Sequence, residues 1–101
     1  MSTQSLRRRA DFSRVRGRGR RFQTSRLAVY SMVKPEGPVR VGIVVGRIVG
    51  CAVERNLVRR RLREAIRALA GSGPRDLVVV ARSESLQATY AELARDLAAA
   101  V

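Results

Sequence analysis

The hydrophobic and polar positions of this chain repeat with helical spacing most clearly between Gly50 and Leu69. At about 100° per residue, one arc of this predicted helix is apolar, comprising Val58, Leu62, Ala65, Ile66 and Leu69. The neighbouring face carries a row of arginines at four-residue intervals, Arg55, Arg59, Arg63 and Arg67, with Asn56 and Arg60 beside it. Like charges at this spacing repel one another. The row therefore favours an anionic partner such as a nucleic-acid backbone, although a solvated basic face has the same pattern.

Shorter stretches in which apolar and polar residues alternate predict β-strands. Arg26–Val33 is the clearest, and a short strand around Arg21–Thr24 precedes it. Val39–Val45 is the next strand, and the prolines and glycine of residues 34–38 predict a turn before it. Two strands joined in this way predict an antiparallel hairpin. The apolar, largely β-branched run Asp76–Ala81 is typical of a central strand that is buried on both faces.

The remaining segments predict two further helices and their connections. We expect residues 1–9 to be a polar, mobile lead-in and Ala10–Arg16 to form a short helix. The glycines of residues 16–21 end that helix, and the arginines of the same run make a flexible cationic loop. Gly71–Pro74 ends the long helix, and Leu86–Ala100 is a final helix.

This order predicts a single α+β domain over residues 1–101, an α-β-β-β-α-β-α two-layer sandwich with helices mainly on one face of a central sheet. The strand–helix–strand unit from Val39 to Ala81 would place two strands parallel in that sheet. Its crossover should be right-handed by the general rule. The other face of the sheet, with Phe12 and Tyr30 near it, would stay open.

The charge of the chain indicates what kind of partner it binds. The sequence has 21 basic residues and only 8 acidic ones, a net charge of +13. Residues 1–67 hold 18 basic and 4 acidic residues, and residues 68–101 hold 3 and 4. The partner-binding surface should therefore come from the first two-thirds of the chain. Lys34 is the only lysine. Guanidinium groups suit RNA phosphates and bases; a genome-wide codon bias would also favour arginine over lysine, but it would not produce the excess of positive charge.

Most catalytic chemistries are excluded by composition. The chain has no histidine and one cysteine, Cys51, which rules out histidine-based triads and zinc clusters. The spacing of Gly42, Gly46 and Gly50 matches neither the Walker-type nor the Rossmann-type glycine pattern that binds phosphate. We therefore predict no catalytic residue and no metal ligand on this chain. A single cysteine fits a reducing cytoplasm, and neither a membrane-spanning run nor a secretory signal is present.

At residues 50–64 the sequence resembles the signature helix of the protein subunit of bacterial ribonuclease P, G-x-A-V-x-R-N-x-[IV]-[KR]-R-x-x-R-[EQ]. The matching residues are Gly50, Ala52, Val53, Arg55, Asn56, Arg59, Arg60 and Arg63. Asp11-Phe12-x-x-Val15 with Gly19 resembles the opening helix and loop of that family. Arg40-Val41-Gly42 and residues 76–82 resemble its third and fourth strands, so the resemblance covers nearly the whole chain.

The resemblance implies a left-handed β-α-β crossover, against the general rule. It also implies that a catalytic RNA, using Mg²⁺ held by RNA and substrate, removes the 5′ leader of precursor tRNA. The protein would bind that RNA and contact the leader in a cleft between the sheet and the first helix, with no protein partner required. A general basic RNA-binding or ribosomal-type protein without a role in cleavage is the alternative. A nuclease acting alone would need clustered carboxylates, which we do not find.

Matching positions suggest two groups of site residues. The leader-binding group is Phe12, Arg16, Tyr30, Asn56, Arg59 and Arg63. The group that would hold the catalytic RNA is Arg47, Arg55, Arg60 and Arg67. Phe12 is equally plausible as a core residue, and Tyr30 as the cap of a strand. The family often has an aromatic where this chain has Arg16, a basic residue in place of Ile48, and Asn in place of Cys51.

Overall fold

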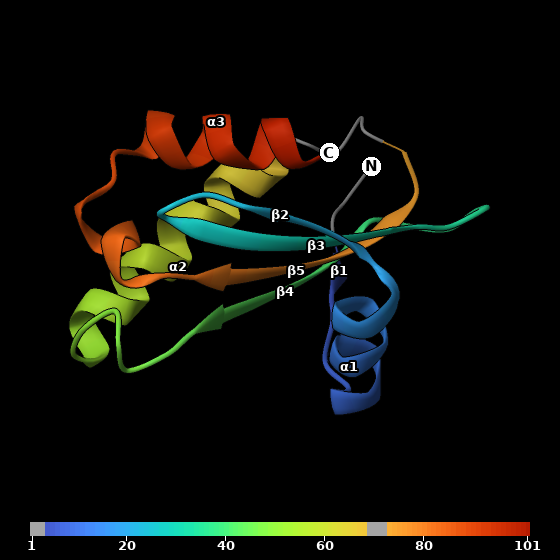
Figure 1. Cartoon of the computed structure of the whole chain (residues 1–101), viewed down its shortest axis with the longest axis horizontal. Coiled ribbons are helices and arrows are strands. Elements are labelled where there is room, and N and C mark those ends of the chain that lie inside the picture. Colours follow the sequence, from blue (N-terminus) through green and yellow to red (C-terminus); the bar gives the residue numbers. More distant parts are fainter. Residues whose placement is uncertain (1–3, 69–72) are drawn as a thin grey trace.

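The computed structural model describes residues 4–68 and 73–101 and contains one mixed five-stranded sheet (Figure 1). The strand order is β1-β4-β5-β3-β2. The strands are β1 (Gln4–Ser5), β2 (Arg20–Gln23), β3 (Leu27–Val33), β4 (Arg40–Val45) and β5 (Arg75–Ala81). The helices are α1 (Arg9–Arg18), α2 (Ala52–Arg67) and α3 (Tyr90–Ala100), and a short 3₁₀ helix, η1, spans Ser83–Gln87. The predicted α+β domain is confirmed.

The centre of the sheet is β5, which pairs parallel with β4 and antiparallel with β3. The prediction for Asp76–Ala81 as a central strand and for the parallel β-α-β unit is therefore confirmed. The predicted hairpin between β3 and β4 is wrong, because β5 lies between them. A strand as apolar as β5 needs hydrogen-bonding neighbours on both sides, and it finds them in β3 and β4. The turn at residues 34–38 spans the gap that β5 fills.

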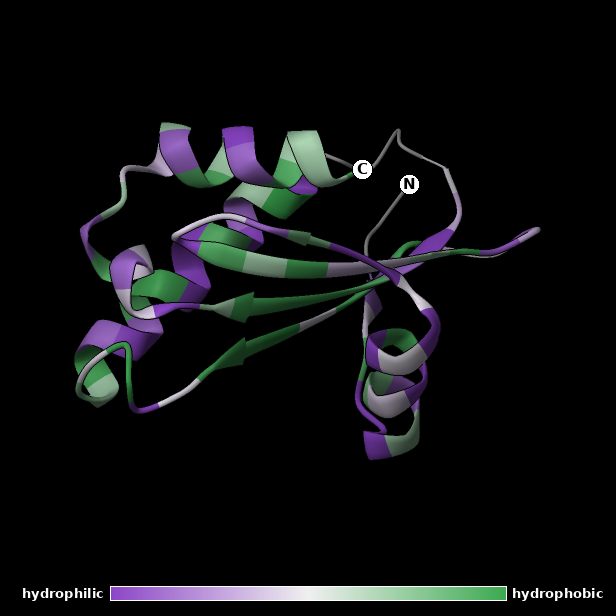
Figure 2. Ribbon diagram, in the orientation of Figure 1, coloured by the Kyte–Doolittle hydropathy of each residue, from purple (hydrophilic) through white to green (hydrophobic). Residues whose placement is uncertain are grey.

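The two faces of the sheet are covered differently (Figure 1). The larger core joins β3, β4 and β5 to α2 and α3 on one face, through buried residues such as Leu27, Leu77, Leu62 and Leu97. The smaller core lies on the opposite face, where Val15 of α1 packs against Leu6 and Val78. In Figure 2 the central strands are hydrophobic, whereas α2 and α1 carry hydrophilic bands. Two helices thus share one face as expected. The other face does not stay open as expected, because α1 crosses it.

The beginning of the described chain corrects two expectations. Within the expected mobile lead-in, Gln4 and Ser5 pair with Arg40 and Val41, and Leu6 is buried; residues 1–3 lie outside the described residues. The predicted cationic loop at residues 16–21 is instead the last turn of α1 and the start of β2, joined at Gly19. A Cβ at Gly19 would overlap the carbonyl oxygen of Val15. Glycine at this position therefore allows β2 to follow α1 directly, without a loop.

The start of α2 is capped by the backbone and a carboxylate. Glu54 accepts a hydrogen bond from the Cys51 backbone N–H at 2.9 Å. This bond lowers the pKa of Glu54 and satisfies one of the free amides of the first turn. Gly50 has φ +155°, and a Cβ there would overlap the Glu54 carboxylate. The predicted stop of this helix at Gly71–Pro74 lies partly outside the described residues; α2 ends at Arg67.

The last helix begins at Tyr90 and not at Leu86. Thr89 and Glu92 form a capping box, in which the Glu92 N–H donates to Thr89 Oγ1 at 3.1 Å and the Thr89 N–H donates to Glu92 Oε1 at 3.0 Å. The T-x-x-E pattern is a known signal for a helix start, and apolar periodicity alone missed it. Residues 83–87 form the 3₁₀ helix η1 instead.

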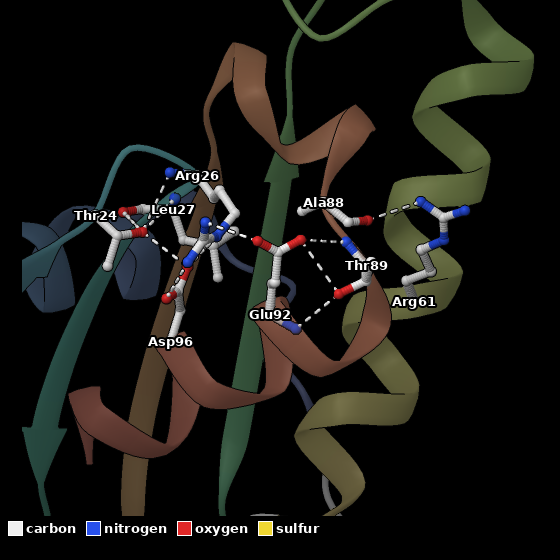
Figure 3. Close-up of polar contacts among 8 residues, drawn as sticks. All are labelled: Thr24, Arg26, Leu27, Arg61, Ala88, Thr89, Glu92 and Asp96. Atoms are coloured by element: carbon white, nitrogen blue, oxygen red, sulfur yellow. Dashed lines mark hydrogen bonds and ion pairs between the residues drawn. The ribbon is translucent and has the colours of Figure 1, made fainter.

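Charged side chains tie α3 to the rest of the molecule (Figure 3). Arg26, before β3, donates to both carboxylate oxygens of Asp96, at 2.9 and 3.1 Å, and to Glu92 at 3.2 Å. Thr24 donates to Asp96 as well, at 2.9 Å. Arg61 of α2 donates to the backbone oxygen of Ala88 at 3.2 Å. These arginines therefore hold α3 in place and are not free for a partner.

A second ionic cluster fixes α1 on its face of the sheet. The carboxylate of Asp76, at the start of β5, is fully buried. It accepts hydrogen bonds from Arg40 at 3.1 and 2.9 Å and from Arg14 of α1 at 2.8 Å, and Lys34 Nζ lies 2.9 Å away. Burial would raise the pKa of Asp76, but the hydrogen bonds from Arg40 and Lys34 outweigh it and leave that pKa below its ordinary value.

Replacing this carboxylate should destabilise the fold strongly. Asp76→Asn leaves three cations around a neutral amide, and we expect the free energy of unfolding to fall by about 2–4 kcal/mol, because breaking a buried ion pair leaves charge uncompensated. Urea unfolding followed by circular dichroism measures the change. Glu64→Gln removes an exposed carboxylate from α2 and should change stability by less than about 0.5 kcal/mol. Equal effects of the two substitutions would contradict the role given to Asp76.

Acid should weaken the fold through the same group. The pKa of Asp76 is lowered in the folded state, so the folded chain binds this proton less readily than the unfolded chain. Its stabilising contribution is complete above the unfolded pKa of about 3.9 and is lost as the pH falls through the folded pKa. Urea midpoints measured between about pH 7 and pH 2 should fall less steeply for Asp76→Asn than for the native chain. Parallel curves would show that other carboxylates dominate.

Candidate nucleic-acid interface

The solvent-facing side of α2 presents the predicted arginine row. Val58, Leu62, Ala65 and Ile66 are buried against the sheet and α3, so the arginines at the intervening positions turn outward. Arg60, Arg63 and Arg67 are exposed, and Arg55 and Arg59 are half-buried. Within residues 4–68 and 73–101, none of the five forms an ion pair with a carboxylate. The row is therefore a surface of uncompensated positive charge.

A hollow of about 370 Å³ lies between this row and α1. Phe12 of α1 borders it on one side, and Arg59, Arg63 and Arg67 border it from α2. Its remaining wall is formed by residues of β1, β4 and α2 and by Leu6, namely Gln4, Ser5, Leu6, Val41, Ile43 and Ile66. The geometry thus combines an aromatic ring, an apolar wall and three guanidinium groups, a combination suited to an RNA strand with its bases and phosphates. We call it the α2 hollow.

The ring of Phe12 rests on the backbone of Gly42 in β4. A Cβ at Gly42 would overlap two carbons of this ring and lie in tight contact with a third. Phe12 also packs against the smaller core of Leu6, Val15 and Val78, yet it remains half-exposed. The two readings of Phe12, as core and as wall of the cleft, are therefore compatible.

Tyr30 lies on the same face of the sheet but does not line the α2 hollow. It packs against the smaller core, and the guanidinium carbons of Arg16 and Arg21 lie 5.4 and 5.9 Å from the centre of its ring. These are cation–π distances. The leader group predicted from the sequence is thus divided between the α2 hollow and this Tyr30 cluster. Arg21 was not among the residues predicted from the sequence, although its place opposite Tyr30 in the β2–β3 pair follows from the strand register.

The other predicted residues take the following places. Asn56 is exposed on α2 and accepts a hydrogen bond from Arg59 at 3.2 Å, so it orients a guanidinium that borders the hollow. Arg47 is exposed in the turn before α2. Arg67, predicted with Arg55 and Arg60 for the catalytic RNA, instead borders the α2 hollow beside Arg63. Ile48, where the family often has a basic residue, is 76% exposed.

The acidic residues leave these surfaces positive. Asp11, Asp76, Glu92 and Asp96 are all engaged in ion pairs that hold α1 or α3 to the sheet or to the segment before β3. Over the described ranges, no group of three or more histidine, cysteine, aspartate and glutamate side chains lies close enough to hold a metal ion. Among the described helices, none has the length and apolar character needed to cross a bilayer.

A basic α+β domain that presents unpaired arginines beside an aromatic-lined hollow belongs to the class of RNA-binding proteins. The family model described as Ribonuclease P matches residues 1–101, and the chain belongs to that family. It is 38% identical to a ribonuclease P protein component of Gluconacetobacter diazotrophicus, over 91% of this chain and 83% of that protein. It is 45% identical to one of a Nocardioides species, with the same coverage.

Solved structures agree with this assignment. The ribonuclease P protein of Staphylococcus aureus superposes with a TM-score of 0.82 at 26% identity, covering 95% of this chain and 90% of that one. The ribonuclease P protein of Thermotoga maritima gives a TM-score of 0.80 at 27% identity, covering 95% and 93%. The likeness therefore extends over the whole fold and is not limited to the signature helix.

The packing of the Phe12 ring on Gly42 can be tested by adding one methyl group at position 42. Gly42→Ala forces the ring off the strand, and we expect a loss of about 1–3 kcal/mol in the free energy of unfolding, as in other overpacked sites. Gly46→Ala is the matched control, since a Cβ there meets no atom within 4 Å, and it should cost less than about 0.5 kcal/mol. Equal unfolding midpoints for the two variants would show that Phe12 moves away without strain.

Proposed function

We propose that this chain is the RNA-binding protein subunit of ribonuclease P, which assists a catalytic RNA in the endonucleolytic removal of the 5′ leader from precursor tRNA. The observation that carries this proposal is the unpaired arginine row of α2, which faces Phe12 across the α2 hollow. The family membership supports it. The alternative, a general basic RNA-binding protein without a role in cleavage, is not favoured, because the relatives are ribonuclease P protein components.

The α2 hollow and the Tyr30 cluster would bind the single-stranded leader. Stacking of a base on an aromatic ring such as Phe12 contributes about 1–3 kcal/mol. Arg59 and Arg63 would contact leader phosphates, and Asn56 would hold Arg59 in place. Where the family often has an aromatic, the guanidinium of Arg16 would stack on bases beside Tyr30. Mature tRNA lacks the leader, so these contacts favour the precursor over the product.

A different set of arginines would hold the catalytic RNA. Arg47, Arg55 and Arg60 are placed around the start and the outer face of α2, where a phosphate backbone can reach them. Mg²⁺ would be held by the RNA and the substrate, since the described part of this chain offers no carboxylate cluster for it. The protein would thus contribute affinity and discrimination, while the bond cleavage takes place on RNA. We expect the assembly to need no second protein and to work in the cytoplasm.

The direct test is a cleavage assay at low Mg²⁺ with a bacterial ribonuclease P RNA and a precursor tRNA. The chain alone should be inert, and its addition should restore cleavage by the RNA and release a mature tRNA with a 5′ phosphate. Binding of the chain to the RNA without any change in rate or substrate affinity would favour the alternative function. Cleavage by the purified chain without RNA would contradict the proposal altogether.

Arg59→Ala and Arg63→Ala should discriminate between precursor and product. Each removes a phosphate contact worth about 1.5 kcal/mol, so the holoenzyme should lose about tenfold in affinity for precursor tRNA and little for mature tRNA. Arg82→Ala removes an exposed arginine outside the site and is the matched control. Dissociation constants for both RNAs give the comparison; equal losses for precursor and mature tRNA would contradict the leader contact.

Arg60→Ala should act on assembly with the catalytic RNA. Loss of one phosphate contact lowers the slope of log affinity against log salt by about 0.7–0.9. Filter binding of the chain to the catalytic RNA over a salt series measures this slope. Arg67 borders the α2 hollow, so Arg67→Ala should reduce both this slope and the preference for precursor. An unchanged slope for Arg60→Ala would exclude Arg60 from the contact.

A further inference from the structure

We infer that the edge of the sheet formed by β2 carries a second RNA site, which binds the part of the leader furthest from the cleavage point. The site consists of Arg18, Arg20 and Arg21 together with the hollow beside them, and we call it the β2-edge site. The inference rests on the proposed function, because it concerns the path of the same leader strand.

The hollow of the β2-edge site has a volume of about 510 Å³. Arg18, Arg20 and Arg21 line it from the end of α1 and from β2. Its apolar and small side chains come from the adjoining strands and from the end of α3, namely Phe22, Ser31, Met32, Val33, Ala99, Ala100 and Val101, and Arg75 completes the lining. Cationic groups beside an aromatic and apolar surface are the usual features of a single-strand site, and a duplex is too wide to enter a hollow of this size.

The charges of this site are available to a ligand. Arg18 and Arg20 are exposed and, within the described ranges, have neither a carboxylate nor a side-chain hydrogen-bond partner. Three arginines near the other strands are different: Arg14 of α1, Arg26 before β3 and Arg40 of β4 are each paired with a buried carboxylate, Asp76 or Asp96. Uncompensated guanidinium groups on neighbouring positions attract an anion, and RNA phosphates are the anions that this family meets.

Arg21 connects this site to the leader surface already described. Its guanidinium lies 5.9 Å from the ring of Tyr30 on the face that α1 crosses, and the same residue lines the hollow on the edge. An RNA leader that lies on Tyr30 can therefore continue over β2 and remain in contact with arginine side chains along this path. The two edges of the sheet are β1 and β2, and the α2 hollow is lined by residues of β1 and its neighbour β4, on the side away from β2. Because α2 would hold the catalytic RNA, nucleotides at the far edge are the upstream ones.

The test compares precursor tRNAs whose leaders have roughly 2, 6 and 12 nucleotides, which bracket the usual footprint of single-strand sites. Single-turnover cleavage at increasing holoenzyme concentration gives the affinity for each precursor. In Arg18→Ala/Arg20→Ala, the shortest leader should bind as in the native holoenzyme, and the longest should lose affinity. Loss of two phosphate contacts lowers the salt slope by about 1.4, so the loss should be about sevenfold larger at 50 mM than at 200 mM salt.

Two controls separate this site from a general effect of charge. Arg82→Ala/Arg95→Ala also removes two exposed arginines and should leave the dependence on leader length unchanged. Arg20→Glu tests the same position by charge reversal, and it should give a larger loss for the longest leader only. Unfolding midpoints equal to that of the native chain establish that the variants are folded.

Several outcomes would overturn the inference. An equal loss for all three leaders would place the contact on the tRNA body. Weaker binding of the double variant to the catalytic RNA in the absence of substrate would place the contact on the catalytic RNA. A native holoenzyme whose affinity does not rise between the intermediate and the longest leader would exclude an upstream site, while its activity would leave the proposed function intact. A native chain that fails to restore cleavage at all would overturn the proposed function itself.

Discussion

The arrangement of this molecule depends on one buried carboxylate. Asp76 lies at the start of the central strand and holds Arg14 of α1, Arg40 of β4 and Lys34 of the turn between β3 and β4. Without that anchor, α1 would rest on the sheet mainly through the small cluster around Val15 and the contact of Arg16 with Tyr30. The place of α1 sets the place of Phe12, and therefore the width of the α2 hollow. A single ion cluster thus determines the shape of the proposed leader surface.

The small number of carboxylates also determines how charge is distributed over the molecule. A chain with 8 acidic residues and 21 basic ones cannot neutralise itself. The carboxylates of Asp11, Asp76, Glu92 and Asp96 form ion pairs within the fold, and each joins a helix to the sheet or to the segment before β3. Among the described residues, guanidinium groups without a carboxylate partner are left on α2, at Arg18 and Arg20 beside the β2 edge, and at other exposed positions such as Arg47. Arginine therefore has two separate roles here, and the position of the nearest carboxylate distinguishes them.

Local patterns in the sequence predicted the elements well, and non-local contacts account for what they missed. The row on α2 and the apolar run of β5 are periodic within themselves, so they could be recognised directly. The insertion of β5 between β3 and β4 has no local signal, because a turn such as residues 34–38 fits a hairpin equally well. Asp76 was read as part of an apolar run, since its three cations come from distant segments. Arg16 was assigned to the leader surface, but its contact with Tyr30 and the neighbouring Arg21 depends on how α1 crosses the sheet.

The position of β5 also bears on how the protein folds. β3 and β4 do not bond to each other, so before β5 joins, the main strand pairing available to the earlier part of the chain is that of β2 with β3. The sheet is completed only by a segment that follows α2, which makes its contacts long-range and its assembly slow relative to local hairpin formation. During synthesis the arginine helix therefore emerges before β5, which completes the sheet, and before α3, against which it packs. A polyanion that binds α2 at that stage would screen its self-repulsion, so RNA can act on the folding of this subunit as well as on its assembly.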